Sequence, residues 1–180
     1  LSIYRGAMRL VTGGSEVLQL PAGYRALADG RLFGLPKVVY YVLATTLAAH
    51  VFLRYTVWGR RVLALGNSES AARLIGLSKP RLTLLTFGIS GALTGLTAVL
   101  LPAYYGTVQS NTGEGMEMKA IAAAVIGGTN ILGGRGSALG TPLGAFLVAL
   151  LYNMLILLEA SSYWQNIFVG GLILLAVVVD

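Results

Sequence analysis

The most constraining feature of this chain is a run of thirteen residues without a charged side chain, Ile121 to Gly133, that leads into a glycine-rich turn. That turn is Gly134-Arg135-Gly136, and a second long apolar segment follows it directly. Lipid tails are as apolar as leucine, so helices in a bilayer associate through close contact of small residues rather than through hydrophobicity. The pattern therefore predicts helices that pack against one another in lipid.

The composition agrees with a membrane protein. The chain is 56% hydrophobic and 11% charged, with a mean hydropathy of +0.75, whereas about 25% of the residues of a soluble domain are charged. It has no cysteine, which excludes disulfides and thiolate metal sites. A net charge of +6 would suit a nucleic-acid binder, but the basic residues lie mostly in one segment between apolar stretches. We therefore expect a lipid bilayer, and no nucleic acid, as a partner.

The order of apolar segments predicts an all-α, polytopic transmembrane helical bundle that forms a single domain over residues 1–180. About five membrane segments are expected, at 36–53, 82–101, 120–133, 138–158 and 167–179. Pro36 suits the first position of its helix, where a missing N–H costs nothing, and Pro102 is expected to end the second helix. Residues 1–11 are interpreted as the tail of a helix that begins upstream, and residues 12–35 as an irregular segment.

Residues 120–133 are short for a membrane span. Fourteen helical residues are about 21 Å long, against a hydrocarbon core of about 30 Å. Either Glu117 to Lys119 belong to this helix, or it is a broken helix lined by protein.

The distribution of Lys and Arg predicts the orientation, because these residues concentrate in cytoplasmic loops. Residues 54–81 hold six basic residues against the single acid Glu69, and are therefore expected to face the cytoplasm. Alternation then puts Arg135 on the inner side. It puts residues 12–35, 103–117 and 159–166 on the outer side.

Small residues repeat at a spacing of four in several of the apolar segments. Residues four apart share one face of a helix, so each set would form a groove in which another backbone can lie close. We predict a helix-packing role for Gly91, Gly95, Gly127, Gly128, Gly136, Gly140 and Gly144.

Catalytic and cofactor chemistry finds no support in the sequence. Gly128 to Ser137 superficially resembles a phosphate-binding loop, but it lacks the lysine that such a loop requires. His50 is the only histidine, and the expected membrane helices offer no carboxylate with which it could form a proton relay. We expect no metal, no cofactor and no enzymatic activity in this chain.

A short ordered helix is predicted within the basic segment 54–81. Asn67 or Ser68 can cap it, Glu69 complements the positive end of its dipole, and Gly76 closes it. Such a helix can belong to a simple loop or can dock on a cytoplasmic partner, and we favour docking.

The chain resembles a transporter family over essentially its whole length. Residues 59–76 (GRRVLALGNSESAARLIG) are similar to the cytoplasmic loop of ATP-binding-cassette importer permeases, with Ala-Ala followed four residues later by Gly. Residues 116–144 (MEMKAIAAAVIGGTNILGGRGSALGTPLG) are similar to the signature of the ribose-type permeases, and residues 163–180 match the last helix of that family. Asn130 stands where Ser is usual and Ser70 where Ala is common, which leaves the sugar undecided.

The resemblance implies the C-terminal part of a membrane-spanning permease subunit in the bacterial inner membrane, since the family has further helices before the point where this chain begins. The subunit would form the pathway for a monosaccharide or a sugar-like solute, such as ribose, xylose, rhamnose or the autoinducer-2 signal. Its partners would be two cytoplasmic ATPase subunits, a second permease subunit and a periplasmic binding protein.

The resemblance also assigns roles to particular residues. Residues 54–81 would be the coupling loop, which contacts the ATPase through Ser70, Ala71, Ala72, Arg73 and Gly76. Thr129 and Asn130 are candidates for lining the pathway. The candidates for docking the binding protein are Glu16, Arg25, Asp29, Glu114 and Glu117.

Two other classes of protein compete with this interpretation. An ion-coupled secondary transporter would need carboxylates inside the membrane helices, and the predicted spans lack them. A non-transporting membrane assembly subunit would accommodate the glycine repeats but would not need an ordered basic loop. Co-purification with an ATPase subunit separates the importer from both.

Overall fold

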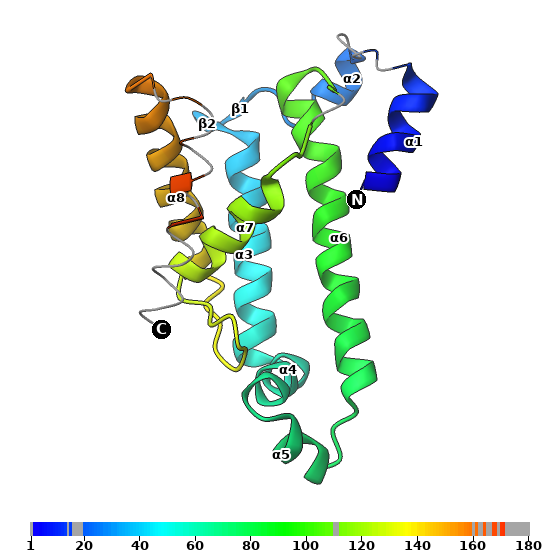
Figure 1. The fold of residues 1–180 in the computed structure, drawn as a ribbon, viewed down its shortest axis with the longest axis vertical. Helices are drawn as coiled ribbons and strands as arrows, with labels where there is room; N and C mark the ends of the chain where they lie inside the picture. Colours follow the sequence, from blue (N-terminus) through cyan, green and yellow to red (C-terminus); the bar gives the residue numbers. More distant parts are fainter. Residues whose placement is uncertain are drawn as a thin grey trace. The chain divides into compact units, whose positions relative to one another are not determined.

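The computed structural model describes residues 2–13, 15, 20–109, 112–159, 161, 164, 167–168 and 170–171 (Figure 1). These residues are mostly helical, as the sequence predicts, and they divide into two compact units. The first unit comprises Leu1–Leu43 and Phe87–Glu114, and the second comprises Ala44–Thr86 and Gly115–Asp180. Two long helices, α3 (Lys37–Tyr55) and α6 (Lys79–Tyr105), contribute residues to both units.

A small hairpin in the first unit is an addition to the predicted all-α fold. It follows the helices α1 (Ser2–Thr12) and α2 (Ala22–Arg25), and pairs strand β1 (Arg31–Leu32) with β2 (Leu35–Pro36) in antiparallel orientation. Its two loop residues, Phe33 and Gly34, have φ angles of 48° and 85°. Positive φ at both positions gives the tight turn that matches the twist of the flanking strands. From the sequence these residues were expected to be irregular.

Directed hydrogen bonds hold the loops of the first unit to its helices. The Tyr24 hydroxyl donates to the carbonyl of Val99 in α6 at 2.7 Å, and Lys37 Nζ donates to the carbonyl of Ala26 at 2.8 Å. The Tyr40 hydroxyl donates to the carbonyl of Leu32 at 2.7 Å. These bonds fix α2 and the hairpin at the beginning of α3.

Among the described residues, three helices are long and apolar enough to cross a membrane, namely α3, α6 and α8 (Gly140–Leu157). Their 19, 27 and 18 residues span about 28, 40 and 27 Å at the α-helical rise. The other two predicted segments are not confirmed. Helix α7 (Met116–Ile126) includes Glu117 to Lys119, but its 11 residues are too few to span a bilayer. Most of residues 167–179 lie outside the described residues.

The prediction that Pro102 ends its helix was wrong. Helix α6 continues for three residues beyond it, to Tyr105. Proline lacks the N–H that would bond to the preceding turn, but its carbonyl still accepts a hydrogen bond, here from the Gly106 N–H at 2.8 Å. Gly106, with a φ of 72°, follows the last helical residue, and a left-handed glycine at that position is a common helix end.

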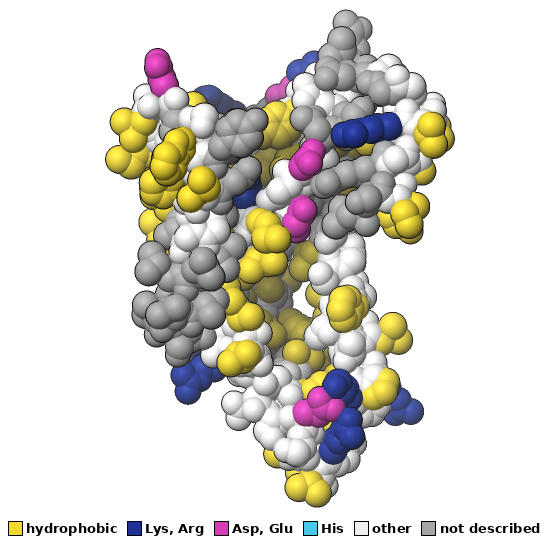
Figure 2. Space-filling model, in the orientation of Figure 1, with side chains coloured by type: hydrophobic (Ala, Val, Ile, Leu, Met, Phe, Trp, Pro, Cys, Tyr) yellow, Lys and Arg dark blue, Asp and Glu magenta, His cyan; other side chains and the backbone are white. Residues whose placement is uncertain are grey.

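The second unit is built around the packing of α7 on α8. Ala122, Ala123 and Val148 form its buried core, and Ile126 and Tyr152 pack against them. Elsewhere the three long helices expose large apolar side chains, such as Leu47, Leu84 and Phe146 at 61%, 76% and 62%. Figure 2 shows such side chains over much of the visible surface. Apolar exposure on this scale indicates contact with lipid or with other protein.

Candidate coupling site

One threonine hydroxyl forms the bend between α3 and α4 (Val57–Asn67). Thr56 Oγ1 donates to the carbonyl of Phe52 at 2.6 Å and accepts from the backbone N–H of Gly59 at 3.0 Å, so that it closes one helix and caps the next. Gly59 is buried in this bend, where a Cβ would lie 2.6 Å from the Cα of Leu53. The first residue of the predicted permease loop motif is therefore required by the geometry of the bend.

The predicted short helix is present as α5 (Glu69–Leu74), and local signals set both of its ends. Ser68, one of the two predicted caps, accepts a hydrogen bond from the Ala71 N–H at 3.3 Å through its hydroxyl. At the other end Gly76 has a φ of 77°. Its N–H donates to the carbonyl of Arg73 at 3.0 Å, and the Leu77 N–H donates to that of Ala72 at 3.0 Å. These are the two bonds of a Schellman helix end.

Glu69 joins α5 to the beginning of α6. Its carboxylate accepts from Arg73 at 2.6 Å and from Lys79, the first residue of α6, at 2.6 Å. The hydrogen bond from Lys79, followed by that from Arg73, lowers the pKa of Glu69 below its usual value. Figure 2 shows Lys and Arg side chains gathered around an acidic one at the foot of the view, where α5 lies in Figure 1. All three side chains are partly exposed, so the ion pairs contribute little to the free energy of folding. Their main effect is to orient α5 relative to the beginning of α6.

The five predicted coupling residues differ in their accessibility. Four of them, Ser70, Ala71, Arg73 and Gly76, are exposed on and after α5, whereas the Ala72 side chain is only 2% exposed. Sequence reasoning missed the two largest exposed apolar side chains here, Leu74 at 89% and Ile75 at 72%. Residue spacing carries no signal for this, because the exposure of Leu74, the last residue of α5, and of Ile75, which follows it, depends on what surrounds the helix.

The residues predicted to dock a binding protein lie in several loops. Arg25 and Asp29 form an exposed ion pair of 3.8 Å at the end of α2. Glu114 lies in the turn before α7, and Glu117 is exposed in the first turn of α7. Glu16 lies outside the described residues.

The two residues predicted to line a pathway lie in the loop that follows α7. Gly128 has a φ of 86° and begins a second Schellman end, in which the Thr129 N–H donates to the carbonyl of Ala124 at 3.0 Å. The Asn130 side chain accepts from the Leu132 N–H at 2.7 Å. The Asn130 backbone N–H donates to the carbonyl of Arg135 at 3.1 Å, and its carbonyl accepts from Gly133 at 3.1 Å. Asn130 therefore shapes the loop itself.

Three of the predicted packing glycines lie where α7 meets α8. A Cβ on Gly127 would be 2.6 Å from the carbonyl carbon of Gly140, and one on Gly144 would be 2.8 Å from the nitrogen of Gly127. Gly136 has ordinary contacts, with a Cβ 3.8 Å from Thr129 Cγ2. Apart from the backbone next to each glycine, no atom of the described residues lies within 4 Å of a Cβ on Gly91, Gly95 or Gly128, so a packing role for these three stays a prediction.

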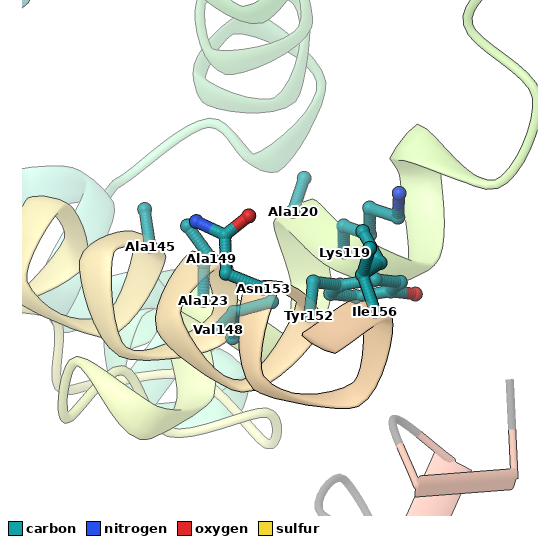
Figure 3. Close-up of a pocket in the computed structure, with 9 residues that line it drawn as sticks. All are labelled: Lys119, Ala120, Ala123, Ala145, Val148, Ala149, Tyr152, Asn153 and Ile156. Carbon is teal, nitrogen blue, oxygen red and sulfur yellow. The ribbon is translucent and has the colours of Figure 1, made fainter. Parts of the chain in front are cut away.

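A groove of about 520 Å³ lies between α7 and α8 (Figure 3). Small apolar residues form most of it, and its polar groups come from Lys119, Tyr152 and Asn153. The Lys119 ammonium lies 4.1 Å from the centre of the Tyr152 ring, which is a cation–π contact. This groove is a second place, besides the loop after α7, where polar groups lie beside a helix of membrane-spanning length, here α8.

Comparison with known proteins identifies relatives over the whole chain. A family model described as branched-chain amino acid transport system / permease component matches residues 4–177. The chain is 39% identical over 179 residues to the autoinducer 2 import system permease protein LsrC of Klebsiella pneumoniae, which is 99% of this chain and 52% of that protein. Identity to the proteins of the same name from Yersinia pestis and Yersinia enterocolitica is 37% and 35%, over 51% and 49% of their lengths. The chain thus spans about half the length of these curated relatives. No solved structure matches it significantly.

Proposed function

Because the chain belongs to the family of branched-chain amino acid transport system permease components, we propose that it is part of the membrane-spanning permease subunit of an ATP-binding-cassette importer. The observation that carries the proposal is the family match over residues 4–177. Three helices of spanning length, and a basic loop between two of them that holds an ordered helix, support it.

The proposed solute is autoinducer 2 or a related sugar-like molecule. The support is that the relatives described above are each named as a permease protein of an autoinducer 2 import system. On this proposal the protein resides in the bacterial inner membrane as a multi-pass subunit and pairs with a second permease subunit. Two cytoplasmic ATPase subunits drive it, and a periplasmic binding protein delivers the solute. The chain itself hydrolyses no ATP.

Coupling to the ATPase is proposed to occur at α5. Leu74 and Ile75 would enter an apolar cleft of the ATPase, since their exposed area is removed from water on docking. Ser70, Ala71 and Gly76 are small enough to let the helix seat closely, and Arg73 supplies a positive charge at the rim. Ala72 would contribute by packing α5 in place. Nucleotide-driven movement of the ATPase would then bias the permease between two states.

The test uses the full-length permease, expressed with its ATPase and second subunit. Leu74→Asp should abolish co-purification of the ATPase while leaving membrane insertion intact, because a carboxylate would have to be buried in the cleft. Phe33→Asp is the matched control, since Phe33 is 96% exposed in the hairpin before α3, which the charge distribution predicts to face outward. A wild-type permease that co-purifies with no ATPase, or uptake driven by an ion gradient without ATP, would refute the importer.

The groove between α7 and α8 is proposed to contribute to the solute pathway. Its support is the meeting of an ammonium, a phenol and an amide beside membrane helices, since polar groups at such places mark transport routes. Asn153→Leu should reduce uptake without changing ATPase co-purification. Unchanged uptake by this variant would remove the groove from the pathway.

A further inference from the structure

We infer that Gly66 and Asn67 at the end of α4 and Gly133-Gly134 in the loop before α8 form a rigid coupling joint, through which movement of α5 reaches the α7–α8 pair. The inference rests on the proposed importer function. It adds specific residues to that function. The sequence analysis placed Gly66 and Asn67 within the coupling loop but gave none of the four residues a role in transmission, and all of them lie in the second unit.

The two segments meet backbone to backbone. A Cβ on Gly66 would lie 2.6 Å from the nitrogen of Gly134, and a Cβ on Gly133 would lie 2.9 Å from the carbonyl oxygen of Gly66. A Cβ on Gly134 would lie 2.9 Å from the Cα of Asn67. With main-chain atoms this close, no flexible side chain lies between the segments to absorb a displacement. The contact is therefore stiff in compression.

The loop on one side of the joint is braced. Asn130 makes three hydrogen bonds within residues 130–135, and the Schellman end at Gly128 fixes the start of the loop on α7. Gly133 and Gly134 have φ angles of 96° and 79°, which other residues rarely adopt. A displacement of α4 against this loop is therefore transmitted to α7 and α8, because the loop has few alternative conformations that could absorb it.

The other side of the joint leads directly to α5. Ser68 ends α4, with its N–H bonded to the carbonyl of Ala64 at 3.2 Å, and the same residue caps α5. Beyond the loop, the Ser137 hydroxyl accepts from the N–H of Gly140, the first residue of α8, at 2.9 Å. Gly140 in turn contacts Gly127 at the end of α7. A continuous series of packed contacts therefore connects α5 with α7 and α8, which is the physical requirement for coupling along it.

The first test inserts a wedge into the joint. Gly66→Ala adds one methyl group inside α4, where the backbone is helical and alanine is favoured, so that the substitution disturbs the contact rather than the helix. ATP-dependent uptake into proteoliposomes that contain the full importer should fall roughly twofold to thirtyfold. Co-purification of the ATPase should be unchanged.

The matched control is Gly88→Ala in α6, where no atom of the described residues lies within 4 Å of the new Cβ. Its uptake should equal that of the wild type. Normal uptake by Gly66→Ala, or an equal loss in both variants, would overturn the joint.

The second test closes the joint covalently. These 180 residues contain no cysteine, and the Cβ of Asn67 lies 3.1 Å from the position of a Cβ on Gly134. Disulfides have Cβ–Cβ separations of about 3.5–4.5 Å, so the two segments need to part by only a few tenths of an ångström for the bond to form. The double variant Asn67→Cys/Gly134→Cys should therefore cross-link on mild oxidation. The new Cβ at Gly134 is itself a wedge, 2.9 Å from the Cα of Asn67, so uptake should be below that of the wild type in both redox states. Because a rigid joint does not open during transport, the oxidised importer should nevertheless retain the uptake of its reduced form.

The outcomes of the two tests separate the joint from the proposed function. Cross-linking needs neither ATP nor the ATPase, so an absent cross-link in membranes would overturn the contact itself. Uptake that is lost on oxidation and restored by reductant would show that the contact opens in each cycle, which contradicts a rigid joint. A wild-type protein without an ATPase partner would instead refute the importer.

Discussion

Two glycine pairs with the same spacing have different environments in this protein. Gly140 and Gly144 in α8 contact the backbone of α7, whereas Gly91 and Gly95 in α6 have no described atom within 4 Å of a Cβ. The spacing of four creates a groove in both helices. Proximity in the chain does not explain the difference, because a single loop separates α7 from α6 as well as from α8. The contrast shows that a glycine repeat indicates a surface for packing and not the partner.

The largest expected effect on stability is at Gly140 and Gly144, the pair that contacts another helix. Gly144→Ala would place a methyl group against the carbonyl oxygen of Ala123 and 2.8 Å from the nitrogen of Gly127, and backbone atoms cannot move aside cheaply. We expect a loss of about 1–3 kcal/mol in stability, as for other overpacked interiors. Thermal unfolding of the full-length permease in detergent measures it. Equal melting temperatures for Gly144→Ala and the wild type would contradict the contact between α7 and α8.

A smaller loss of stability is expected at α5, whose ends are set by local hydrogen bonds and not by packing on another helix. Ser68→Ala removes the hydroxyl that caps α5, and such a loss costs about 1 kcal/mol. The α5 amides should exchange with deuterium faster while those of α8 keep their protection. Unchanged exchange of the α5 amides would show that α5 is held by packing rather than by its cap.

For Gly91 and Gly95, the pair without a contacting helix among the described residues, substitution by alanine should raise stability instead of lowering it. Gly91→Ala fills empty space in a helix and should stabilise it by up to about 1 kcal/mol, through helix propensity alone. The measurement is the same thermal unfolding, with Gly144→Ala as its counterpart. If the variant instead loses its second permease subunit on purification, the α6 pair packs on another chain, as the glycine repeat predicts.

The smallest effect is expected from pH. Hydrogen bonds from Lys79 and Arg73 lower the pKa of Glu69, so the ionised carboxylate favours the folded arrangement. Its contribution is present above the usual pKa of 4.5 and is lost as the pH falls through the lowered value. Between pH 6 and 8 the attachment of α5 to α6 should therefore be constant. Hydrogen exchange of α5 in wild type and Glu69→Gln tests this, and a pH-independent difference down to the acid end would contradict it.

The short helix α5 was the part of the candidate site that sequence reasoning predicted best. Ser68 and Gly76 act within a few residues of themselves, so their spacing was enough to predict the cap and the helix end. The ion pair of Glu69 with Arg73 was not predicted, because the sequence analysis assigned Glu69 only to the helix dipole. The hairpin around Phe33-Gly34 was missed because an exposed phenylalanine with a positive φ carries no usual turn signal. The exposure of Leu74 and the burial of Ala72 depended on the surroundings of α5, which spacing does not describe.

Hydropathy and local capping, read from the chain alone, determined that α3, α6 and α8 suit a membrane and that a short helix interrupts the basic segment. These properties depend on neighbouring residues and on transfer from water to lipid, so no long-range contact is needed to infer them. Only the tertiary structure decided which glycines have a partner, because Gly66 and Gly134 are far apart in sequence and meet through backbone atoms. A contact between backbone atoms leaves no side-chain pattern in either segment, so only the folded structure shows that the two segments meet.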